Sequence, residues 1–380
     1  MHQPTNPEFS PEPASPNAHD SPLPVPPEDV GQPIALGSVV VPSRFFLAPL
    51  AGYTSLAYRL VVRSLGGLGL ATTDLVNARS LLENRSKAFE LAETCPEDQP
   101  MAIQIYGAKR DEMAEAARRV VALGASVVDI NMGCPVNKVV KSGGGSALMC
   151  QTDAAVTVVE SVVEAAGVPV TVKMRLGWDD DNLTAPLLAR AFEQVGVAAV
   201  IIHGRTRAQG FRGLVNRDGI RQVVEAVERI PIVANGDILT IADAARMFEE
   251  TGCAAVSIGR GALANPYFFQ QLTRWARTGD PGPAPSFDER VTVMDRHFHA
   301  LLERRGEYLA CLQFRKLIKW YCHWFRPPKP LYHRLINIHS AARFEESVAM
   351  IREAGPVVPL ATLASDSPRI AVPSGPVDKW

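Results

Sequence analysis

The strongest constraint on the fold is an alternation of short apolar runs with longer amphipathic stretches, repeated between residues 45 and 258. The pattern predicts buried strands at Phe45–Pro49, Ala71–Val76, Met101–Tyr106, Val127–Asn131, Val170–Met174, Ala199–Ile202, Ile232–Ala234 and Ala255–Ile258. It predicts helices between them, such as Asp111–Leu123, Asp153–Ala166, Ala185–Val195, Gly219–Glu228 and Ile241–Glu250. Strands separated by helices form parallel sheets covered on both faces. Eight such units over about 225 residues favour an α/β fold of the (β/α)8 TIM barrel type over an open doubly wound sheet.

The two ends of the chain and the segment after residue 278 depart from this pattern. Prolines crowd residues 1–33, where no apolar period is present, so we expect a disordered tail before a barrel domain at 34–278. After a Pro- and Gly-rich loop, only helical periodicity is present, which predicts a C-terminal all-α helical domain at 287–352. Pro and Ser return at 353–380, where we expect a flexible tail.

The composition excludes several classes of protein. With 47% hydrophobic and 21% charged residues, the chain has enough apolar material for a large core, which rules out wholesale disorder. Neither a secretory signal nor a run of about 18 uncharged apolar residues is present, so we expect a soluble, cytoplasmic protein without membrane contact. The six cysteines lie far apart with no C-x-x-C pair, so we expect reduced thiols and no metal site.

Net charge is unevenly distributed along the chain. The formal total is −1, but residues 301–343 carry nine cationic and two acidic side chains, a net +7 that leaves −8 for the remainder. Aromatic residues are interleaved with these cations at Trp320, Tyr321, Trp324, Phe325 and Tyr332. This combination suits a nucleic acid partner. The alternative is that the aromatics form the core of the helical domain and the cations a solvated face.

Polar residues collect at the predicted C-terminal ends of the strands, where TIM barrels carry their chemistry. They are Gln104 in the third strand, Asn131 and Cys134 after the fourth, Lys173 and Arg175 at the fifth, His203 after the sixth, Asn235, Gly236 and Asp237 after the seventh, and Gly259 and Arg260 after the eighth. The last two groups resemble a phosphate cradle, because glycine lets backbone N–H groups approach an anion and arginine adds a fork of donors. An ordinary turn is the alternative.

Three polar residues in these strands have both a functional and a structural interpretation. A lysine in an apolar strand must meet an anion or a polar cofactor, or form an ion pair with a neighbouring strand, since burying it unpaired is costly. His203 is either a satisfied core histidine or a site residue, and its shared strand-end layer with Lys173 and Asn235 favours the site. Gln104 binds a ligand or bonds to backbone.

Cys134 is the most specific single candidate for a functional residue. Most free cysteines are buried small hydrophobes. This one follows Asn131-Met132-Gly133, precedes Pro135, and introduces a glycine-rich loop at 141–146 that could fold over a substrate. The other five cysteines lack such surroundings and are expected to serve packing.

Taken in order, these segments resemble the dihydrouridine synthases, most closely the bacterial B-type branch. The resemblance rests on Leu47-Ala48-Pro49-Leu50-Ala51-Gly52-Tyr53-Thr54, Gln104-Ile105-Tyr106-Gly107, Asp129-Ile130-Asn131-Met132-Gly133-Cys134-Pro135-Val136-Asn137-Lys138-Val139, Val172-Lys173-Met174-Arg175-Leu176-Gly177-Trp178, His203-Gly204-Arg205-Thr206-Arg207, Asn235-Gly236-Asp237-Ile238 and Gly259-Arg260-Gly261-Ala262. It spans about residues 34–342. Asn-Met-Gly-Cys-Pro before a glycine-rich loop is the most specific of these motifs.

The resemblance implies an FMN enzyme that reduces the C5–C6 double bond of particular uridines in tRNA with electrons from NADPH or NADH. Hydride from reduced FMN would go to C6 and a proton from Cys134 to C5. By the family pattern, Pro49, Leu50 and Ala51 would line the flavin, Gln104 would bond its pyrimidine edge, Lys173 would stabilise charge near N1, and His203, Asn235, Gly236, Asp237, Gly259 and Arg260 would hold its phosphate end.

The implied chemistry explains the residue types. A thiol with a pKa near ~8.5 is still mostly protonated at pH 7 and can donate a proton, which an ordinary carboxylate could not. The uridine of a folded tRNA must be flipped out to reach such a site. Contacts to the RNA are expected from Asn131, Lys138, Lys141, Arg175, Arg315, Lys316 and Arg334. We expect a monomer without a stable protein partner.

Two other functions compete with this one. The first is another FMN barrel, acting on a free pyrimidine, which would have no use for a cationic helical appendage. The second is a flavin-free barrel that binds RNA or a sugar phosphate.

Overall fold

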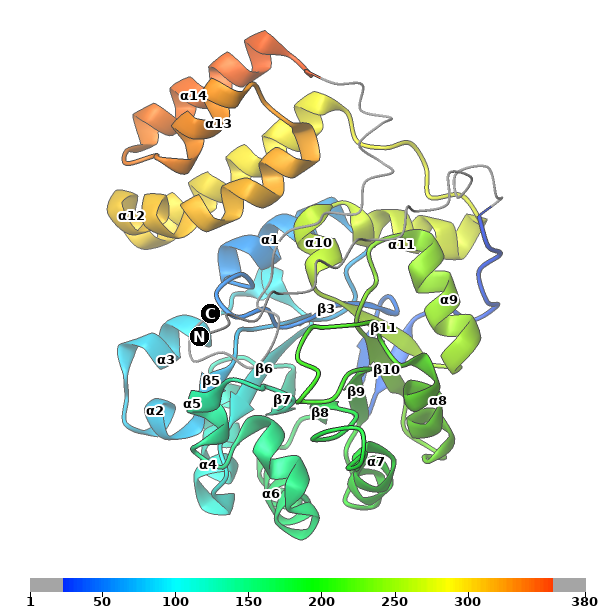
Figure 1. Cartoon of the computed structure of the whole chain (residues 1–380). Helices are drawn as coiled ribbons and strands as arrows, with labels where there is room; N and C mark the ends of the chain where they lie inside the picture. Colours follow the sequence, from blue (N-terminus) through cyan, green and yellow to red (C-terminus); the bar gives the residue numbers. More distant parts are fainter. Residues whose placement is uncertain (1–22, 358–380) are drawn as a thin grey trace, which may run out of the picture.

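A closed ring of parallel strands forms the centre of the molecule (Figure 1). The structure is a computed structural model that describes residues 23–357, so most of the tails expected at 1–33 and 353–380 lies outside it. The strands of the ring are β3 (Phe45–Leu47), β4 (Ala71–Thr72), β5 (Val76–Asn77), β6 (Met101–Tyr106), β7 (Val127–Met132), β8 (Val170–Arg175), β9 (Ala199–His203), β10 (Ile232–Asn235) and β11 (Ala255–Ile258). Pairing of β4 with both β3 and β6 closes the ring. The predicted TIM barrel is confirmed.

The second unit departs from the prediction of one strand at Ala71–Val76. Residues 73–75 leave the ladder between β4 and β5, and the Thr73 hydroxyl accepts a hydrogen bond from the Gln104 backbone N–H at 3.1 Å. The carboxylate of Asp74 accepts from the backbone N–H groups of Gly52 and Leu75. A carboxylate that binds neighbouring loops in this way interrupts regular pairing.

Helices surround the ring and follow the predicted amphipathic stretches closely (Figure 1). They are α1 (Leu56–Leu65), α2 (Ala78–Leu82), α3 (Ser86–Leu91), α4 (Arg110–Ala122), α5 (Asn137–Val140), α6 (Thr152–Ala166), α7 (Ala185–Gln194), α8 (Arg217–Glu225), α9 (Ile241–Thr251), α10 (Arg260–Ala264) and α11 (Phe268–Thr278), with 3-10 turns η1 (Pro96–Asp98) and η2 (Gly145–Cys150). Helix α9 shows how local sequence sets the helix ends. A capping box joins Thr240 and Asp243 at its start, and Gly252 ends it in the left-handed conformation.

A short hairpin plugs the end of the barrel opposite the strand C-termini. Strands β1 (Ile34–Leu36) and β2 (Val39–Val41) pair antiparallel, and Leu36 and Val41 are fully buried. They join a cluster with residues from the N-terminal ends of the strands, such as Phe46 and Val127. The hairpin was absent from the sequence prediction. It covers the N-terminal ends of the strands and closes that end of the barrel core.

The packed part of the chain begins before residue 34, inside the segment predicted as tail. Val30 is buried in the barrel core, and the indole N–H of Trp275 on α11 donates to the Pro24 carbonyl at 2.9 Å. Residues 23–33 carry no helix or strand, yet these contacts place them against the barrel. The disorder predicted for residues 1–22 lies outside the described residues.

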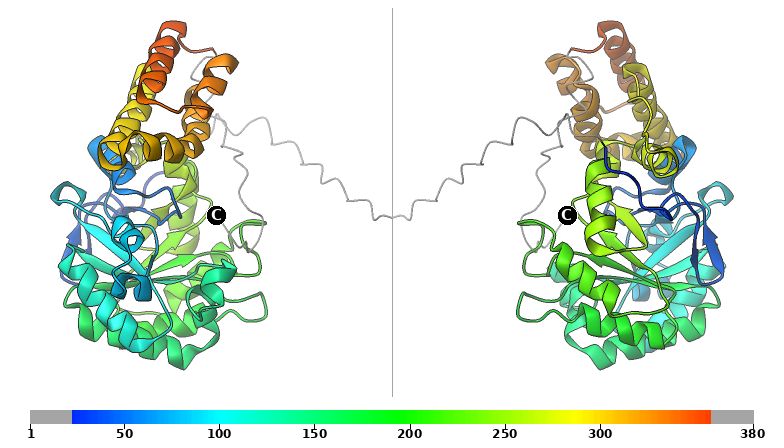
Figure 2. Two further views of the ribbon diagram at one scale, coloured as in Figure 1. Left: turned by 90° about the vertical axis from the view of Figure 1, so that its left-hand side faces the viewer. Right: turned by 90° about the vertical axis from the view of Figure 1, so that its right-hand side faces the viewer.

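The C-terminal region is all-helical, as predicted, and stands over one side of the barrel (Figure 2). It contains α12 (Phe287–Phe325), α13 (Lys329–Ile336) and α14 (Ala341–Ala354). Gly306, with φ of 72°, kinks α12 into two arms. A separate apolar cluster forms its core, in which Phe298, Phe314 and Phe344 pack ring against ring.

Helix α1 joins this region to the barrel, because its apolar residues occupy two faces. Tyr58 and Val62 belong to the barrel core, whereas Ala57, Val61 and Leu65 belong to the core of the helical region. Ion pairs from Arg304 and Arg305 to Glu93 add to the junction. As a result, the second arm of α12 is held over the open end of the barrel.

Within residues 23–357, no helix has the length and apolar character required to cross a membrane. Across the same residues, no three His, Cys, Asp or Glu side chains are grouped so as to hold a metal ion.

Candidate active site

A cavity of about 500 Å³ opens at the C-terminal ends of the barrel strands, within the usual range for small-molecule sites. All of the residues predicted to bind a cofactor line it: Pro49, Leu50, Ala51, Gln104, Lys173, His203, Asn235, Gly236, Asp237, Gly259 and Arg260. Cys134 lines it as well, together with Asn131, Arg175 and Lys316 from the set predicted to bind substrate. The barrel therefore brings residues from seven separate segments of the sequence to one cavity.

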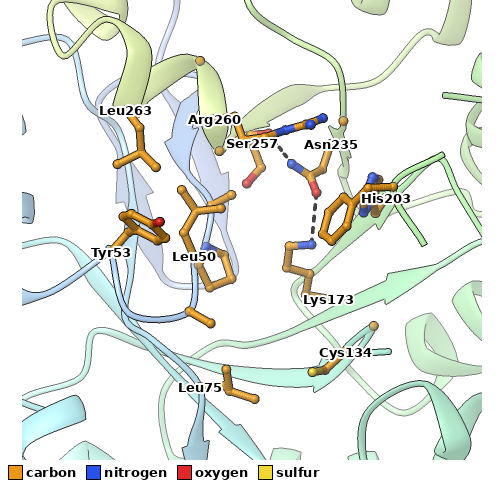
Figure 3. Close-up of a pocket in the computed structure, with 18 of the residues that line it drawn as sticks. Leu50, Tyr53, Leu75, Cys134, Lys173, His203, Asn235, Ser257, Arg260 and Leu263 are labelled. Atoms are coloured by element: carbon orange, nitrogen blue, oxygen red, sulfur yellow. Dashed lines mark hydrogen bonds between the residues drawn. The ribbon is translucent and has the colours of Figure 1, made fainter. Parts of the chain in front are cut away.

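The cavity has chemically distinct ends and sides (Figure 3). Arg260 and Asn235 lie at one end, and Cys134 and Leu75 lie at the other. Leu50 and Leu263 form an apolar side that faces Lys173 and His203. Such a site suits an elongated ligand with an anionic group at one end and a flat, partly apolar body.

Lys173 meets the cavity from strand β8. Its Nζ donates to the Asn235 side-chain oxygen at 3.1 Å, and the Asn235 amide donates in turn to the Ser257 carbonyl at 2.6 Å (Figure 3). Among the described residues Lys173 forms no ion pair. The structural alternative, an ion pair with an acidic side chain on a neighbouring strand, is therefore absent from this part of the chain. Burial, reinforced by the nearby charge of Arg175, lowers the pKa of Lys173 to about 8.

His203 is buried at the end of β9 beside a group of cations. Burial lowers its pKa well below the usual value, and the charges of Arg175, Lys173, Arg205 and Arg260 act in the same direction. Arg205 donates to its Nε2 at 3.4 Å, since a guanidinium can only donate. His203 is therefore a neutral imidazole with its proton on Nδ1.

The Asp237 carboxylate is engaged by two arginines. Arg205, only 2% exposed, forms a fork to it at 3.0 and 2.5 Å, and Arg260 donates to it at 3.0 Å. The Val215 backbone N–H adds a fourth bond, at 3.2 Å. Asp237 was predicted to help hold the phosphate end of the flavin, and its carboxylate is committed to these donors. Its side chain instead orients Arg260, which keeps donors to spare for an anion.

Backbone geometry at the same end supports an anion cradle. Gly236 and Asp237 both have positive φ, 120° and 49°, so the chain turns sharply after β10, beside Arg260 at this end of the cavity. A Cβ on Gly236 would lie 2.6 Å from the Val215 side chain and 2.9 Å from the His203 ring. Glycine is therefore required at this position.

Cys134 projects from the loop after β7 at the other end of the cavity. Its carbonyl accepts hydrogen bonds from the Ser146 N–H at 3.1 Å and the Ser146 hydroxyl at 3.0 Å, which fasten the glycine-rich loop against it. This close approach requires Gly145, since a Cβ there would lie 2.8 Å from the Cys134 carbonyl oxygen. Burial raises the pKa of the thiol, so Cys134 keeps its proton at neutral pH.

Gln104 and Asn131 connect the strands below Cys134. The Asn131 amide donates to the Gln104 side-chain oxygen at 2.8 Å, and its own oxygen accepts the Cys134 backbone N–H at 3.0 Å. The Gln104 amide donates to Asp129 at 2.6 Å. The side-chain amide of Gln104 therefore bonds to two side chains and not to backbone, which was the structural alternative for this residue.

The four other residues predicted to contact RNA lie outside the cavity. Lys138 lies on α5 and Lys141 caps its end, beside the cysteine loop. Arg315 donates to the Ile338 carbonyl at 2.8 Å, and Arg334 binds Ser347 at 3.0 Å and also Glu346. Arg315 and Arg334 therefore connect helices within the C-terminal region, whereas the structure gives Lys138 and Lys141 no ion pair among the described residues.

Most aromatic residues of α12 form the core of the helical region, which was the alternative to a role in binding nucleic acid. Tyr321 and Phe325 are buried in the core of the helical region, and the ring of Trp324 packs at a tilt against that of Tyr267. Trp320 differs, because it also lines the cavity and its indole N–H has no hydrogen-bond partner within the described chain.

Sequence reasoning did not place several residues at the cavity, although it had named Trp320 among the aromatics of the cationic segment. Lys319 and Trp320 reach the cavity from α12, Tyr53 from the loop after β3, and Phe211 from the loop after β9. Arg205 was noted in a motif without a role. The spacing of Lys316, Lys319 and Trp320 by three and four residues indicates one helix face, but no sequence signal shows that this face covers the barrel mouth.

The family model described as dihydrouridine synthase matches residues 46–354. The chain belongs to the dihydrouridine synthase family. The enzyme class predicted from the sequence, an oxidoreductase, is confirmed with it. Relatives include the probable tRNA-dihydrouridine synthase 1 of Synechocystis sp., 38% identical over 81% of this chain and 86% of that protein. The tRNA-dihydrouridine synthase B of Pseudomonas aeruginosa is 37% identical over 76% of this chain and 86% of that protein.

Solved structures with low sequence similarity share the fold alone. The 6-hydroxypseudooxynicotine amine oxidase of Pseudomonas geniculata is 13% identical with a TM-score of 0.53, over 73% of this chain and 55% of that one. A 2-naphthoyl-CoA reductase is 14% identical with a TM-score of 0.51, over 67% of this chain and 53% of that one. The match therefore spans about half of each of these longer chains.

Proposed function

We propose that this member of the dihydrouridine synthase family is an FMN-dependent enzyme that reduces the C5–C6 double bond of uridines in tRNA, with electrons from NADPH or NADH. The observation that carries the proposal is the arrangement of one cavity, with a protonated thiol at one end and an anion cradle at the other. The names of the relatives support tRNA as the substrate.

The residues present fit FMN. Arg260 and the backbone around Gly236 suit its phosphate, and a side chain at 236 would collide with Val215 and His203 beside them. Leu50, Ala51 and Pro49 offer an apolar side for a flat ring, opposite Lys173. Bound FMN, once reduced by NADPH or NADH, would supply the hydride for C6 of the uracil.

Cys134 supplies the proton for C5 in this proposal. Hydride addition leaves enolate-like charge on the uracil, which a nearby acid must quench. The raised pKa of Cys134 keeps the thiol protonated, and the hydrogen bonds of Asn131 and Ser146 hold its backbone at the cavity. The Asn131 amide is committed to Gln104, so any contact with the uracil would use its remaining donor or acceptor capacity.

The helical region supplies a surface for the RNA. Lys316 and Lys319 line the cavity mouth from α12, and Lys138 and Lys141 lie beside the cysteine loop. The net +7 of residues 301–343 suits a phosphate backbone and predicts an affinity that falls steeply with salt. A surface that spans the mouth in this way fits a uridine flipped out of a larger RNA better than a free pyrimidine.

The test of the proposal is the conversion of uridine in an unmodified tRNA transcript by the purified protein with NADPH. We expect bound FMN and the appearance of dihydrouridine, with no turnover of free uracil or dihydroorotate. Turnover of a free pyrimidine would favour the other FMN barrels, and a protein without flavin would favour a binding function.

Replacing Gly236 with alanine is expected to weaken FMN binding by about tenfold or more, since overpacking of this kind typically costs 1–3 kcal/mol. Fluorescence of FMN released on dilution measures the dissociation constant. Gly124→Ala is the matched control, because Gly124 also has positive φ, 106°, but its added Cβ would meet no atom closer than 3.5 Å. Equal loss in both variants would assign the effect to backbone strain rather than to the cradle.

The rate at which NADPH reduces the bound FMN is expected to fall as pH rises through about 8, where Lys173 loses its proton. Below that pH the Nζ is charged and stabilises negative charge in the cavity, and above it this stabilisation is lost. Anaerobic stopped-flow absorbance at saturating NADPH measures the rate. Lys173→Arg should remove the fall, because a guanidinium stays protonated. A fall that persists in this variant would assign it to another group.

A further inference from the structure

A row of polar side chains lies across three neighbouring strands below the cavity. Gln104 on β6 is in register with Asp129 on β7, and Asp129 is in register with Thr171 on β8. All three are buried, and Asp129 is 1% exposed. Asp129 does not line the cavity, and nothing above assigns it a role. A carboxylate this deep in a barrel core is costly unless its hydrogen bonds are all made.

The hydrogen bonds of this row form one chain that ends at Cys134. The Thr171 hydroxyl donates to one oxygen of Asp129 and the Gln104 amide to the other, each at 2.6 Å. Asn131 donates to Gln104 at 2.8 Å and accepts from the Cys134 and Gly133 backbone N–H groups at 3.0 and 3.3 Å.

The direction of every bond in the chain is determined by its two ends. Backbone N–H groups can only donate, so Asn131 must turn its oxygen toward Cys134 and its NH2 toward Gln104. An ionised carboxylate can only accept, so Gln104 must turn its NH2 toward Asp129. The two requirements agree. A reversed Gln104 amide would place NH2 against NH2 at one end and oxygen against carboxylate at the other.

We propose that Asp129 is a positioning residue that fixes the orientation of the Gln104 amide at the cavity. In this orientation the second N–H of Gln104 and the second lone pair of its oxygen are available to a ligand. Gln104 then presents one hydrogen-bond donor and one acceptor to the ligand, and Asp129 determines which side of the amide carries which. The pyrimidine edge of a flavin carries acceptors on either side of a donor and can pair with such an amide. The inference rests on the proposed function, because it names FMN as the ligand.

The electrostatic surroundings agree with an ionised Asp129. Burial raises its pKa to about 6, although the hydrogen bonds from Thr171 and Gln104 and the charge of Lys173 act in the opposite direction. Asp129 therefore accepts from both partners at neutral pH.

The test compares variants that remove or keep the acceptor that Asp129 offers to Gln104. Asp129→Ala is expected to weaken FMN binding by about tenfold, the usual effect of losing a hydrogen bond to a charged group. Asp129→Asn should bind FMN within about threefold of wild type, because its oxygen still accepts from Gln104 while its NH2 donates to the Thr171 hydroxyl. Thr171→Val is the matched control: it removes the other bond to the same carboxylate and should leave FMN binding unchanged. Should the alanine variant not fold, Asp129→Leu, which keeps the branched side-chain skeleton but has no acceptor, replaces it.

A double-mutant cycle with Gln104→Leu separates positioning from general stabilisation of the barrel. If Asp129 acts through Gln104, adding Asp129→Ala to the Gln104→Leu variant changes the FMN dissociation constant by less than about twofold. An independent tenfold loss in that background would overturn the inference, as would unchanged FMN binding in Asp129→Ala.

Measuring FMN binding to the wild type and the variants separates failure of the proposed function from failure of the role of Asp129. A wild-type protein that binds no FMN overturns the proposed function itself. A wild-type protein that binds FMN, with variants that do not follow the cycle, overturns only the role of Asp129.

Discussion

Cys134→Ala is expected to lower the rate of dihydrouridine formation by about 10²- to 10⁴-fold, the usual contribution of a positioned general acid. The effect is large because Cys134, whose thiol is kept protonated by burial, lies at the end of the cavity away from Asn235 and Arg260 (Figure 3). His203 is neutral with its proton on Nδ1, and Lys173 is hydrogen-bonded to Asn235. Release of dihydrouridine from an unmodified tRNA transcript, quantified by mass spectrometry of nucleosides, measures the loss.

The same variant is expected to keep its FMN, since Cys134 lies at the opposite end of the cavity from Arg260 (Figure 3). Equal flavin absorbance in wild type and variant checks this expectation. Cys150→Ala is the matched control, because Cys150 is an exposed cysteine on η2 of the same loop and should leave the rate unchanged. A Cys134→Ala enzyme with full turnover would contradict the assignment of the acid.

Lys173→Met is expected to slow the reduction of bound FMN by NADPH by about 10²- to 10³-fold, comparable to the loss of one preorganised electrostatic donor. Lys173 places a positive charge near the middle of the cavity, where its Nζ donates to Asn235, whose amide donates in turn to the Ser257 carbonyl. Methionine keeps the length of the side chain but not its charge. Anaerobic stopped-flow absorbance reports the rate directly.

The control for Lys173→Met is Lys173→Arg, which keeps the charge and should retain a larger share of the rate. If methionine and arginine variants are slowed equally, the geometry of the amine rather than its charge is required. If neither is slowed, Lys173 has no part in the reductive half of the reaction.

Much of the site could be predicted because a parallel barrel turns sequence position into spatial position. Each strand delivers its last polar residue to the same end of the ring, so Gln104, Cys134, Lys173, His203 and Arg260 meet although they lie far apart in the chain. Apolar runs of β-branched residues are reliable strand signals, and β6 to β11 follow the prediction within about one residue.

The remaining features depend on tertiary partners that no local pattern contains. Arg205 and Asp237 are 32 residues apart in the sequence but share one fork, because β9 and β10 are neighbouring parallel strands. The β1–β2 hairpin is too short for its periodicity to stand out, and it is stabilised by the barrel floor that it plugs. The placement of Lys316 and Trp320 over the mouth depends on helix α1, whose two apolar faces hold both regions.

The central claim is that one cavity combines a flavin with the Cys134 acid to reduce a uridine of tRNA. The most direct test mixes unmodified tRNA with enzyme whose bound FMN has already been reduced, in the absence of oxygen. Flavin absorbance and dihydrouridine are recorded together. The account predicts that wild-type enzyme forms one dihydrouridine for each flavin oxidised, and that both signals slow by the same factor in Cys134→Ala. Flavin oxidation without dihydrouridine, or equal rates in the two proteins, would contradict it.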